Sequence, residues 1–327
     1  MKTLISNPSS LNFCIYGLGS TGESVVKYLK RKNFHNIKVW DDKIKLKSKK
    51  KNFSKYLDFS DYIILSPGIS LNNAKLKTKL IKNKKKIITD IDLFYLFNRN
   101  IKSIVITGTN GKSTTCKILE HVLKQNKINV KLGGNIGKPI LDINLNSNPI
   151  VIIEASSFQL AYSKFIKPNY AAILNITKDH LDWHGSMRDY VDSKFKIFSN
   201  QNNNDFAYLN NKVLIKKFKK NKFLSKLKYI NINKYKKLQN KINNSYLRSE
   251  VNIENLSYIF ELSKKLKIKE NNIIKTLKNF KGLEHRHEIF YKKNNKIFIN
   301  DSKATSFDAT KSALKSNKNI FWIVGGL

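Results

Sequence analysis

The segment at residues 105–115, VITGTNGKSTT, is the feature that most constrains this chain. An apolar strand runs straight into a glycine turn, and the pattern from Lys112 onward predicts a helix. Gly108 and Gly111 let the backbone turn tightly, so that its N–H groups can point at phosphate oxygens. Lys112 can reach the β- and γ-phosphates, and the hydroxyl of Ser113 can bind Mg²⁺. The segment therefore predicts a phosphate-binding loop and favours an ATP-dependent enzyme.

The spacing of this loop leaves a second interpretation open. It is GxxGKS, shorter than the usual GxxxxGKS, so an ordinary glycine turn is the alternative. The helix that follows favours the phosphate, because the N-terminal end of a helix carries a positive partial charge. The loop alone does not decide between a phosphate-binding loop and an ordinary glycine turn. Residues further along the chain have to decide it.

The charge of the chain suggests nucleic acid, but its distribution argues against it. The formal net charge is +39, and lysine supplies nearly all of the positive charge because there are only five arginines. The lysines are scattered through every segment among Asn and Ile, which also have A/T-rich codons, so genome bias is the simpler cause. We expect no nucleic-acid partner, although acidic, phosphate-bearing ligands would be attracted.

Cysteine usage and hydropathy point to an intracellular protein. Cys14 and Cys116 fall inside a predicted strand and a predicted helix without metal spacing, so we expect reduced core thiols. The N-terminus has no apolar signal region, and no run approaches eighteen apolar residues. We expect a cytoplasmic monomer that does not bind membranes.

Short apolar runs alternate with helical patterns, which predicts α/β layers around parallel sheets in a chain long enough for two or three domains. Residues 212–244, rich in Lys and Asn, have no clear pattern. Beyond residue 284 we expect a hairpin across Asn294-Asn295, then a helix and a strand at 320–324. The strands expected before it are 12–16, 37–40, 62–65, 103–107, 150–153, 170–174 and 206–209. The helices are 21–32, 73–83, 90–98, 112–126, 187–199, 254–266 and 270–279.

A second glycine turn, GLGSTG at 17–22, follows the first predicted strand and opens a helix. Asp41 and Asp42 end the next strand about twenty residues on, as in Rossmann-type dinucleotide sites. Taken alone, this combination indicates NAD or FAD most often. An NAD-dependent enzyme does not account for the loop at Gly108.

Further motifs then follow in a fixed order: GGNIG at 133–137, EASSFQL at 154–160, NITKDHLDWH at 175–184, LEHR at 283–286 and NDSKAT at 300–305. Together with TGTNGKST, they closely resemble the Mur ligases of peptidoglycan synthesis, whose own loop has the short spacing. Within that family, EASSFQL, GLGSTG, SPGI at 66–69 and NDSKAT resemble the branch that adds D-glutamate to UDP-N-acetylmuramoyl-L-alanine. The resemblance covers the chain except 212–244.

The resemblance implies a three-domain architecture. It places a UDP-sugar-binding Rossmann-like domain at 1–100, a central ATP-binding ligase domain at 101–283 and the start of a C-terminal Rossmann-like domain at 284–327. It also reassigns the first glycine turn to the diphosphate of the UDP-sugar, with Asp41 near the uracil. The implied reaction activates the substrate carboxylate as an acyl phosphate, which the amine of D-glutamate attacks.

The resemblance also implies site residues. Lys112, His180 and Lys194 are expected to be catalytic. Mg²⁺ is expected at Ser113, Glu154, His180 and Lys194, the last as a carbamylated lysine. ATP is expected at Gly108, Thr109, Asn110, Gly111, Lys112, Ser113, Thr114, Asn135, Asn252, Asn255, Arg286 and Asp301. The substrate is expected at Gly17, Leu18, Gly19, Ser20, Thr21, Gly22, Asp41, Ser66, Pro67, Gly68, Asn135, Ser156, Lys303 and Thr305.

Alternatives stay open for several of these residues. Glu154 could instead cap the helix that starts near Ser156, His180 could be structural, and Asn135 could be an ordinary turn residue. Lys194 is one lysine among dozens, so the resemblance alone carries its role.

Two departures from the family pattern matter. Residues 249–255, SEVNIEN, keep both asparagines of a family motif but lose its glycine and histidine. The family normally continues after Gly325-Gly326 by on the order of a hundred residues, which hold D-glutamate. A C-terminally truncated, inactive UDP-sugar- and ATP-binding fragment is therefore one alternative expectation. A sister ligase that adds another amino acid is the other.

Overall fold

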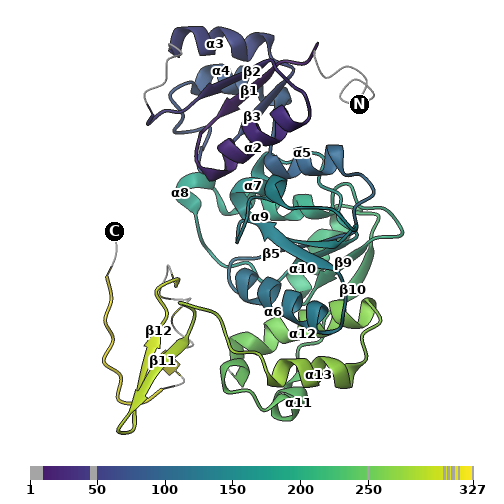
Figure 1. Cartoon of the computed structure of the whole chain (residues 1–327), viewed down its shortest axis with the longest axis vertical. Coiled ribbons are helices and arrows are strands. Elements are labelled where there is room, and N and C mark those ends of the chain that lie inside the picture. The colour runs from purple at the N-terminus through teal and green to yellow at the C-terminus, as the bar shows by residue number, and fades with distance from the viewer. Residues whose placement is uncertain are drawn as a thin grey trace. The chain divides into compact units, whose positions relative to one another are not determined.

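A computed structural model describes residues 10–44, 50–248, 250–304, 307, 310, 314–315 and 317–325 (Figure 1). The chain divides into two compact units. Unit 1 comprises Met1–Thr109 and Asn129–Lys228, and unit 2 comprises Asn110–Ile128 and Tyr229–Leu327. Within the described ranges, no helix is both long and apolar enough to span a membrane.

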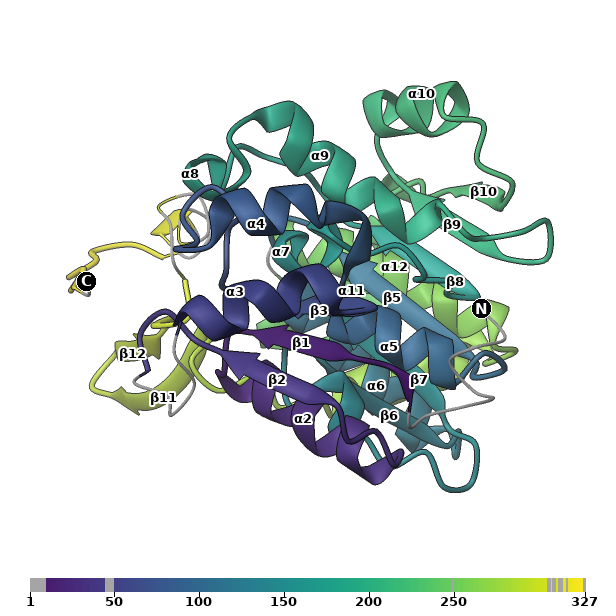
Figure 2. The same ribbon diagram turned by 90° about the horizontal axis from the view of Figure 1, so that it is seen from above.

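The first sheet of unit 1 is parallel, with strand order β2-β1-β3-β4. Alternate residues of β1 point to opposite faces: Phe13 and Ile15 pack in the core with Val25 of α2, whereas Cys14 and Tyr16 pack in a separate core with Phe53 of α3. Both views accordingly show α2 and α3 on opposite sides of this sheet (Figures 1 and 2). The elements are β1 (Phe13–Tyr16), α2 (Ser20–Arg31), β2 (Ile37–Trp40), α3 (Lys50–Phe59), β3 (Tyr62–Leu65), α4 (Lys77–Lys82), β4 (Ile87–Ile88) and α5 (Asp90–Phe97).

The second sheet of unit 1 has six strands in the order β10-β9-β8-β5-β7-β6. Its central strand, β5, pairs in parallel with β7 and with β8 and is fully buried, as expected of a strand covered on both faces. The elements are β5 (Ser103–Thr107), β6 (Val130–Gly134), β7 (Ile150–Glu154), α7 (Ser157–Ala161), β8 (Tyr170–Ile173), α8 (Leu181–His184), α9 (Met187–Phe195), β9 (Phe206–Leu209), α10 (Lys212–Lys220) and β10 (Lys226–Tyr229).

Within the described residues, the elements of unit 2 are α-helices, a short 3-10 helix at Ser245–Arg248 and a hairpin. Asn126, just after α6, donates a hydrogen bond to the Thr276 hydroxyl of α13 (3.4 Å). The hairpin turns at Asn294 and Asn295, which both have positive φ, as two-residue turns of this kind require. The elements are α6 (Lys112–Gln125), α11 (Asn233–Ile242), α12 (Glu250–Lys265), α13 (Glu270–Lys278), β11 (Glu288–Lys293) and β12 (Lys296–Asn300).

Most expected elements are present, and the misses have local causes. All seven expected strands before residue 284 are found, as is the Asn294-Asn295 hairpin. The helix expected at 73–83 begins only at Lys77, after a turn. Residues 212–244, which lack a clear pattern, form α10, β10 and α11. The mixed α/β class with parallel sheets is confirmed, whereas the boundaries of the three expected domains stay a prediction.

The expected strand at 320–324 is wrong. Phe321 is 98% and Ile323 95% exposed, and no strand of the described chain pairs with this segment. A strand needs a neighbour for its backbone N–H and C=O groups, so hydrophobic alternation alone does not make one. The helix expected before it falls largely on residues outside the described ranges.

Helix α5 is attached to the segment between α7 and β8 by a buried carboxylate. Asp92 is fully buried and accepts hydrogen bonds from the Ser163 hydroxyl (2.7 Å) and from the backbone N–H groups of Lys164 (2.9 Å) and Phe165 (2.7 Å). Its neighbour Asp90 is equally buried but poorly satisfied: Oδ2 accepts one long bond from Gln159 (3.4 Å), and Oδ1 has no partner within the described part of the chain. Burial therefore raises the pKa of Asp90 to about 6.

We expect Asp90→Asn to abolish a pH dependence of stability. With the pKa of Asp90 raised above its ordinary value of 3.8, the folded state binds more protons than the unfolded state between about pH 4 and 6. The contribution of Asp90 to stability should fall over that window as pH rises, by up to about 3 kcal/mol, and stay lower above it. The difference in stability between the wild type and the Asn variant should show this fall, because the other titrating groups act in both proteins. Urea unfolding from pH 4.5 to 7.5 measures it; Glu23→Gln, at an exposed site, should keep the wild-type slope. An unchanged slope in Asp90→Asn would contradict the assignment.

Candidate active site

Three predicted site segments of unit 1 follow neighbouring strands of the six-stranded sheet. Gly108 follows β5, Glu154 ends β7 beside it, and the segment containing His180 follows β8 on the other side. Parallel strands end at the same edge of a sheet, and ligands bind there where the chain changes its winding direction. Here the chain adds β6 and β7 on one side of β5 and then β8, β9 and β10 on the other.

Unit 1 holds the first half of the phosphate loop through a buried lysine. The Lys194 ammonium donates a hydrogen bond to the Gly108 carbonyl (2.8 Å) and lies 4.5 Å from the centre of the Tyr190 ring. The Tyr190 hydroxyl is 2.8 Å from that of Thr109, which also accepts from the N–H of Thr177 (3.0 Å). Lys194 is thus set apart from the many surface lysines by near-complete burial against the loop.

Unit 2 holds the second half of the loop, from Asn110 to Thr114, through a buried amide. Gly111 has φ +82°, and a Cβ there would lie 2.3 Å from Oδ1 of Asn255, so a side chain does not fit. The same Oδ1 accepts from the Thr115 hydroxyl (3.1 Å). The Asn255 amide nitrogen donates to Asn252 (3.1 Å), which in turn donates to the Tyr246 carbonyl (2.9 Å). Both asparagines therefore support the loop from within the protein.

The side chain of Arg286, in the same unit, contacts the first turn of α6. One of its guanidinium nitrogens donates to the Ser113 hydroxyl (3.0 Å). Lys112, half-buried, precedes this serine in the first turn of the helix. Asp301 accepts from the N–H of His287 (2.9 Å), and the side chain of Lys303 is exposed. Thr305 lies outside the described residues.

Glu154 is a buried carboxylate with one oxygen available. It is 1% exposed, and its Oε1 accepts from the Asn135 amide (2.8 Å). Oε2 has no hydrogen-bond partner among the described residues. The alternative that Glu154 caps a helix is wrong, because Ser156 is the cap of α7, in a capping box with Gln159. A buried free carboxylate oxygen suits a cation, although the described residues contain no cluster of three His, Cys, Asp or Glu side chains that could hold a metal.

His180 lies at the start of α8 with a positive φ of 52°. Its Nε2 is 3.3 Å from the Asp179 carboxylate, and its ring is 4.6 Å from that of Phe158. The ring is half exposed, so it is accessible to a ligand.

The first glycine turn is fixed from two sides. The Asp41 carboxylate accepts from the N–H groups of Leu18 (2.8 Å) and Lys43 (2.8 Å), and the Ser66 hydroxyl donates to the Gly17 carbonyl (2.8 Å). Burial opposes ionisation of Asp41, but these backbone N–H groups outweigh it and lower its pKa. A Cβ at Gly22 would lie 1.9 Å from the Gly17 carbonyl oxygen, so the glycine is required for close approach. Of the other expected substrate residues here, Gly19, Ser20 and Thr21 belong to this turn and the start of α2, and Pro67 and Gly68 follow Ser66 after β3.

Three contacts of the site were not expected from the sequence. Tyr190 binds Thr109, Asp42 accepts from the hydroxyl of Tyr16 (2.8 Å), and the His184 ring lies 2.9 Å from the Ser157 hydroxyl. The only sequence signal was that both histidines of DHLDWH sit four residues apart, which places them on one face of a helical turn.

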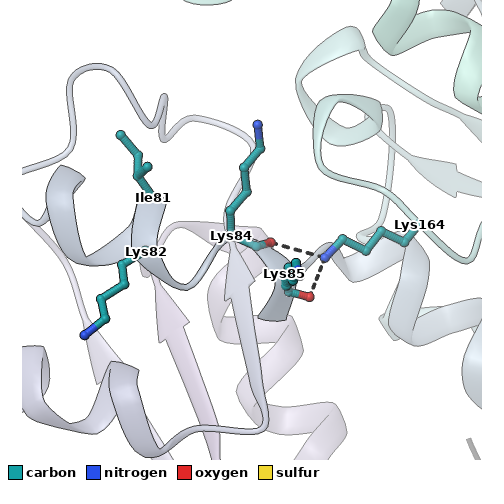
Figure 3. A pocket seen from close by; sticks show the side chains of 5 residues that line it. All are labelled: Ile81, Lys82, Lys84, Lys85 and Lys164. Carbon is teal, nitrogen blue, oxygen red and sulfur yellow. Dashed lines mark hydrogen bonds between the residues drawn. The ribbon is translucent and has the colours of Figure 1, made fainter.

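A separate pocket in unit 1 has a volume of about 650 Å³. It is lined by Ile81, Lys82, Lys84, Lys85 and Lys164 (Figure 3). The Lys164 ammonium donates to the backbone carbonyls of Lys84 (3.2 Å) and Lys85 (2.7 Å), while Lys82 and Lys84 point away from each other. No predicted site residue lines it, and its ammonium groups do not converge on one ligand.

Known proteins resemble this chain in sequence and in fold. The family model described as Mur ligase middle domain matches residues 106–275. The UDP-N-acetylmuramoylalanine–D-glutamate ligase of Rickettsia prowazekii is 34% identical, covering 96% of this chain and 76% of that protein. The ligase of the same name from Aquifex aeolicus is 35% identical, covering 97% and 77%. The crystal structure of MurF ligase from Thermotoga maritima in complex with ADP covers 97% of this chain and 75% of its own, with a TM-score of 0.54 at 15% identity, a likeness of fold.

We expect Gly111→Ala to weaken nucleotide binding by at least about tenfold. The new methyl group would collide with Asn255 and strain a left-handed residue, so the loop has to move. Titration calorimetry with a non-hydrolysable ATP analogue measures the effect, and far-ultraviolet circular dichroism reports on folding. Gly325→Ala is the matched control, because its Cβ meets nothing within 4 Å. Wild-type affinity in Gly111→Ala would contradict the role given to Asn255.

Proposed function

The chain belongs to the Mur ligase family, and we propose that it uses ATP to join D-glutamate to UDP-N-acetylmuramoyl-L-alanine. It thereby makes a cytoplasmic precursor of peptidoglycan and forms ADP. The observation that carries the proposal is the convergence of a loop glycine, a buried carboxylate and a buried lysine at the ends of β5, β7 and α9 in unit 1. Relatives named for this reaction match nearly the whole chain.

The residues of the loop supply binding and charge. Backbone N–H groups of the loop and the N-terminal end of α6 receive the phosphates, and Lys112 neutralises the γ-phosphate as the substrate carboxylate attacks it. Two anions meet in this step, so the enzyme acts mainly by orienting them and balancing their charge. Arg286, which reaches Ser113, adds a second cation at the same end of the helix.

The implied magnesium fits the available donors. Glu154 has a buried oxygen without a partner among the described residues, and Ser113 offers a hydroxyl at the helix start. Both are oxygen ligands, which Mg²⁺ prefers. We propose Glu154, His180 and a carbamylated Lys194 as Mg²⁺ ligands of unit 1, and Ser113 as a Mg²⁺ ligand of unit 2. When bound, the ions would withdraw charge from the phosphate oxygens.

The first sheet is proposed to bind the UDP part of the substrate. The glycine turn at 17–22 is held in shape by Asp41 and Ser66, so its N–H groups can face a diphosphate. The hydrogen bonds of Asp41 to the backbone indicate that it shapes the turn, and we propose that it also lies near the uracil. Asn135 and Ser156 would contact the substrate between its two ends.

A direct assay tests the proposal. Purified protein is given ATP, Mg²⁺, UDP-N-acetylmuramoyl-L-alanine and D-glutamate, and phosphate release and the ligated product are measured. Replacing D-glutamate by L-alanine, L-lysine or meso-diaminopimelate tests a sister ligase. Ligation of one of these in preference to D-glutamate would overturn the proposed amino acid.

We expect Lys112→Ala to lower ADP formation by at least about 10³-fold, because it removes the charge that balances the γ-phosphate. Binding of the UDP-sugar, measured by calorimetry without ATP, should stay within about twofold. Lys117→Ala, one turn further along α6, should leave both unchanged because its ammonium pairs with Glu120. Equal losses of both functions in Lys112→Ala would contradict the division of labour.

A further inference from the structure

His184 is a buried histidine that the proposed mechanism does not use. It ends α8 and is 8% exposed. Its Nε2 lies 2.9 Å from the hydroxyl of Ser157, the first residue of α7. A hydrogen bond therefore joins the turn that carries His180 to the helix that begins just after Glu154.

The His184 ring also packs against two other site elements. It stacks on Phe158 with ring centres 5.7 Å apart at 12°, and it meets Tyr190 of α9 edge-on at 5.2 Å. Phe158 in turn contacts the His180 ring at 4.6 Å, and Tyr190 binds the hydroxyl of Thr109 in the phosphate loop. Phe158 is thus in contact with both histidines, so a shift of His184 reaches His180 through one ring.

The charge state of His184 suits this structural linkage. Burial lowers the pKa of His184 to about 4; electrostatic repulsion from Lys194 and His180 acts in the same direction, and the negative charges of Asp189 and Asp182 oppose it. The ring is therefore neutral at physiological pH, with one nitrogen as donor and the other as acceptor. A neutral ring can bond a serine hydroxyl without bringing a further charge beside Lys194.

We propose that His184 and Ser157 are positioning residues for the ligation, because their hydrogen bond fixes Phe158 and, through it, the ring of His180. The inference rests on the proposed function, in which His180 contacts the reacting groups. His184 itself has no proposed contact with the substrate. It acts through Phe158 toward His180 and through Tyr190 toward Thr109.

Substitutions separate the hydrogen bond from the packing. His184→Phe keeps an aromatic ring and loses the bond, Ser157→Ala loses the same bond from the other side, and His184→Gln places an amide nitrogen near the position of Nε2. We expect kcat to fall about 10- to 100-fold in the first two variants with little change in the KM for ATP. The Gln variant should recover at least about threefold over Phe.

A double variant tests whether the two residues act as one pair. His184→Phe combined with Ser157→Ala should lose no more activity than either single variant, because one bond is removed in all three. The matched control is Ser225→Ala, whose buried hydroxyl has no partner within the described residues and should keep wild-type kinetics. Additive losses in the double variant, or wild-type kcat in His184→Phe, would overturn the proposal.

A spectroscopic readout makes the result independent of catalysis. The protein has six histidines, so the ring signal of His180 can be assigned by substitution in a ¹H–¹³C spectrum of histidine-labelled protein. We expect His184→Phe and Ser157→Ala to shift that signal, because the ring current of Phe158 acts on His180, and Ser225→Ala to leave it in place. An unmoved signal in both variants would overturn the proposal. If the wild-type chain is inactive, the proposed ligase function is overturned. The His180 signal would still test whether His184 and Ser157 position His180.

Discussion

The parallel pairing of β5 with β7 and β8 is the constraint on which the site of unit 1 depends. Backbone hydrogen bonds set the register, with Ile106 opposite Glu154 on one side and Thr107 opposite Ile173 on the other. Because all three strands end at one edge, residues far apart in sequence arrive together without long loops. A shift of one residue in either pairing would turn each side chain of that strand to the other face. The position of Glu154 is therefore set by strand register.

Buried polar side chains support the two glycine turns that follow the strands. Lys194 binds the Gly108 carbonyl in unit 1, and Asn255 fills the space beside Gly111 in unit 2. Removing the Lys194 side chain would take a hydrogen bond from the buried Gly108 carbonyl. Removing the Asn255 side chain would leave a void beside Gly111. The phosphate loop is thus supported by side chains that come late in the chain. The same holds for the first glycine turn, where Asp41 and Ser66 bind the backbone of residues 17 and 18.

Local patterns in the sequence predict the strands and both glycine turns, since hydrophobic runs and glycine placement are properties of neighbouring residues. The burial of Lys194 is different, because nothing near residue 194 distinguishes it from the other lysines until β5 and α9 are placed together. The hydrogen bonds of Asn252 to Tyr246 and of Asn255 to Thr115 were likewise not expected, and nucleotide binding by these asparagines stays a prediction. Such long-range hydrogen bonds depend on packing, which no single-segment pattern records. The unpaired segment at 320–324 makes the same point for a strand.

The contact between Arg286 and Ser113 has a consequence for the charge at the start of α6. One lone pair of the serine hydroxyl accepts from the guanidinium, which leaves the hydroxyl hydrogen and the second lone pair for other partners. The guanidinium adds its charge to the positive N-terminal end of the helix. Any further cation at that hydroxyl would therefore need an anion beside it to offset the repulsion.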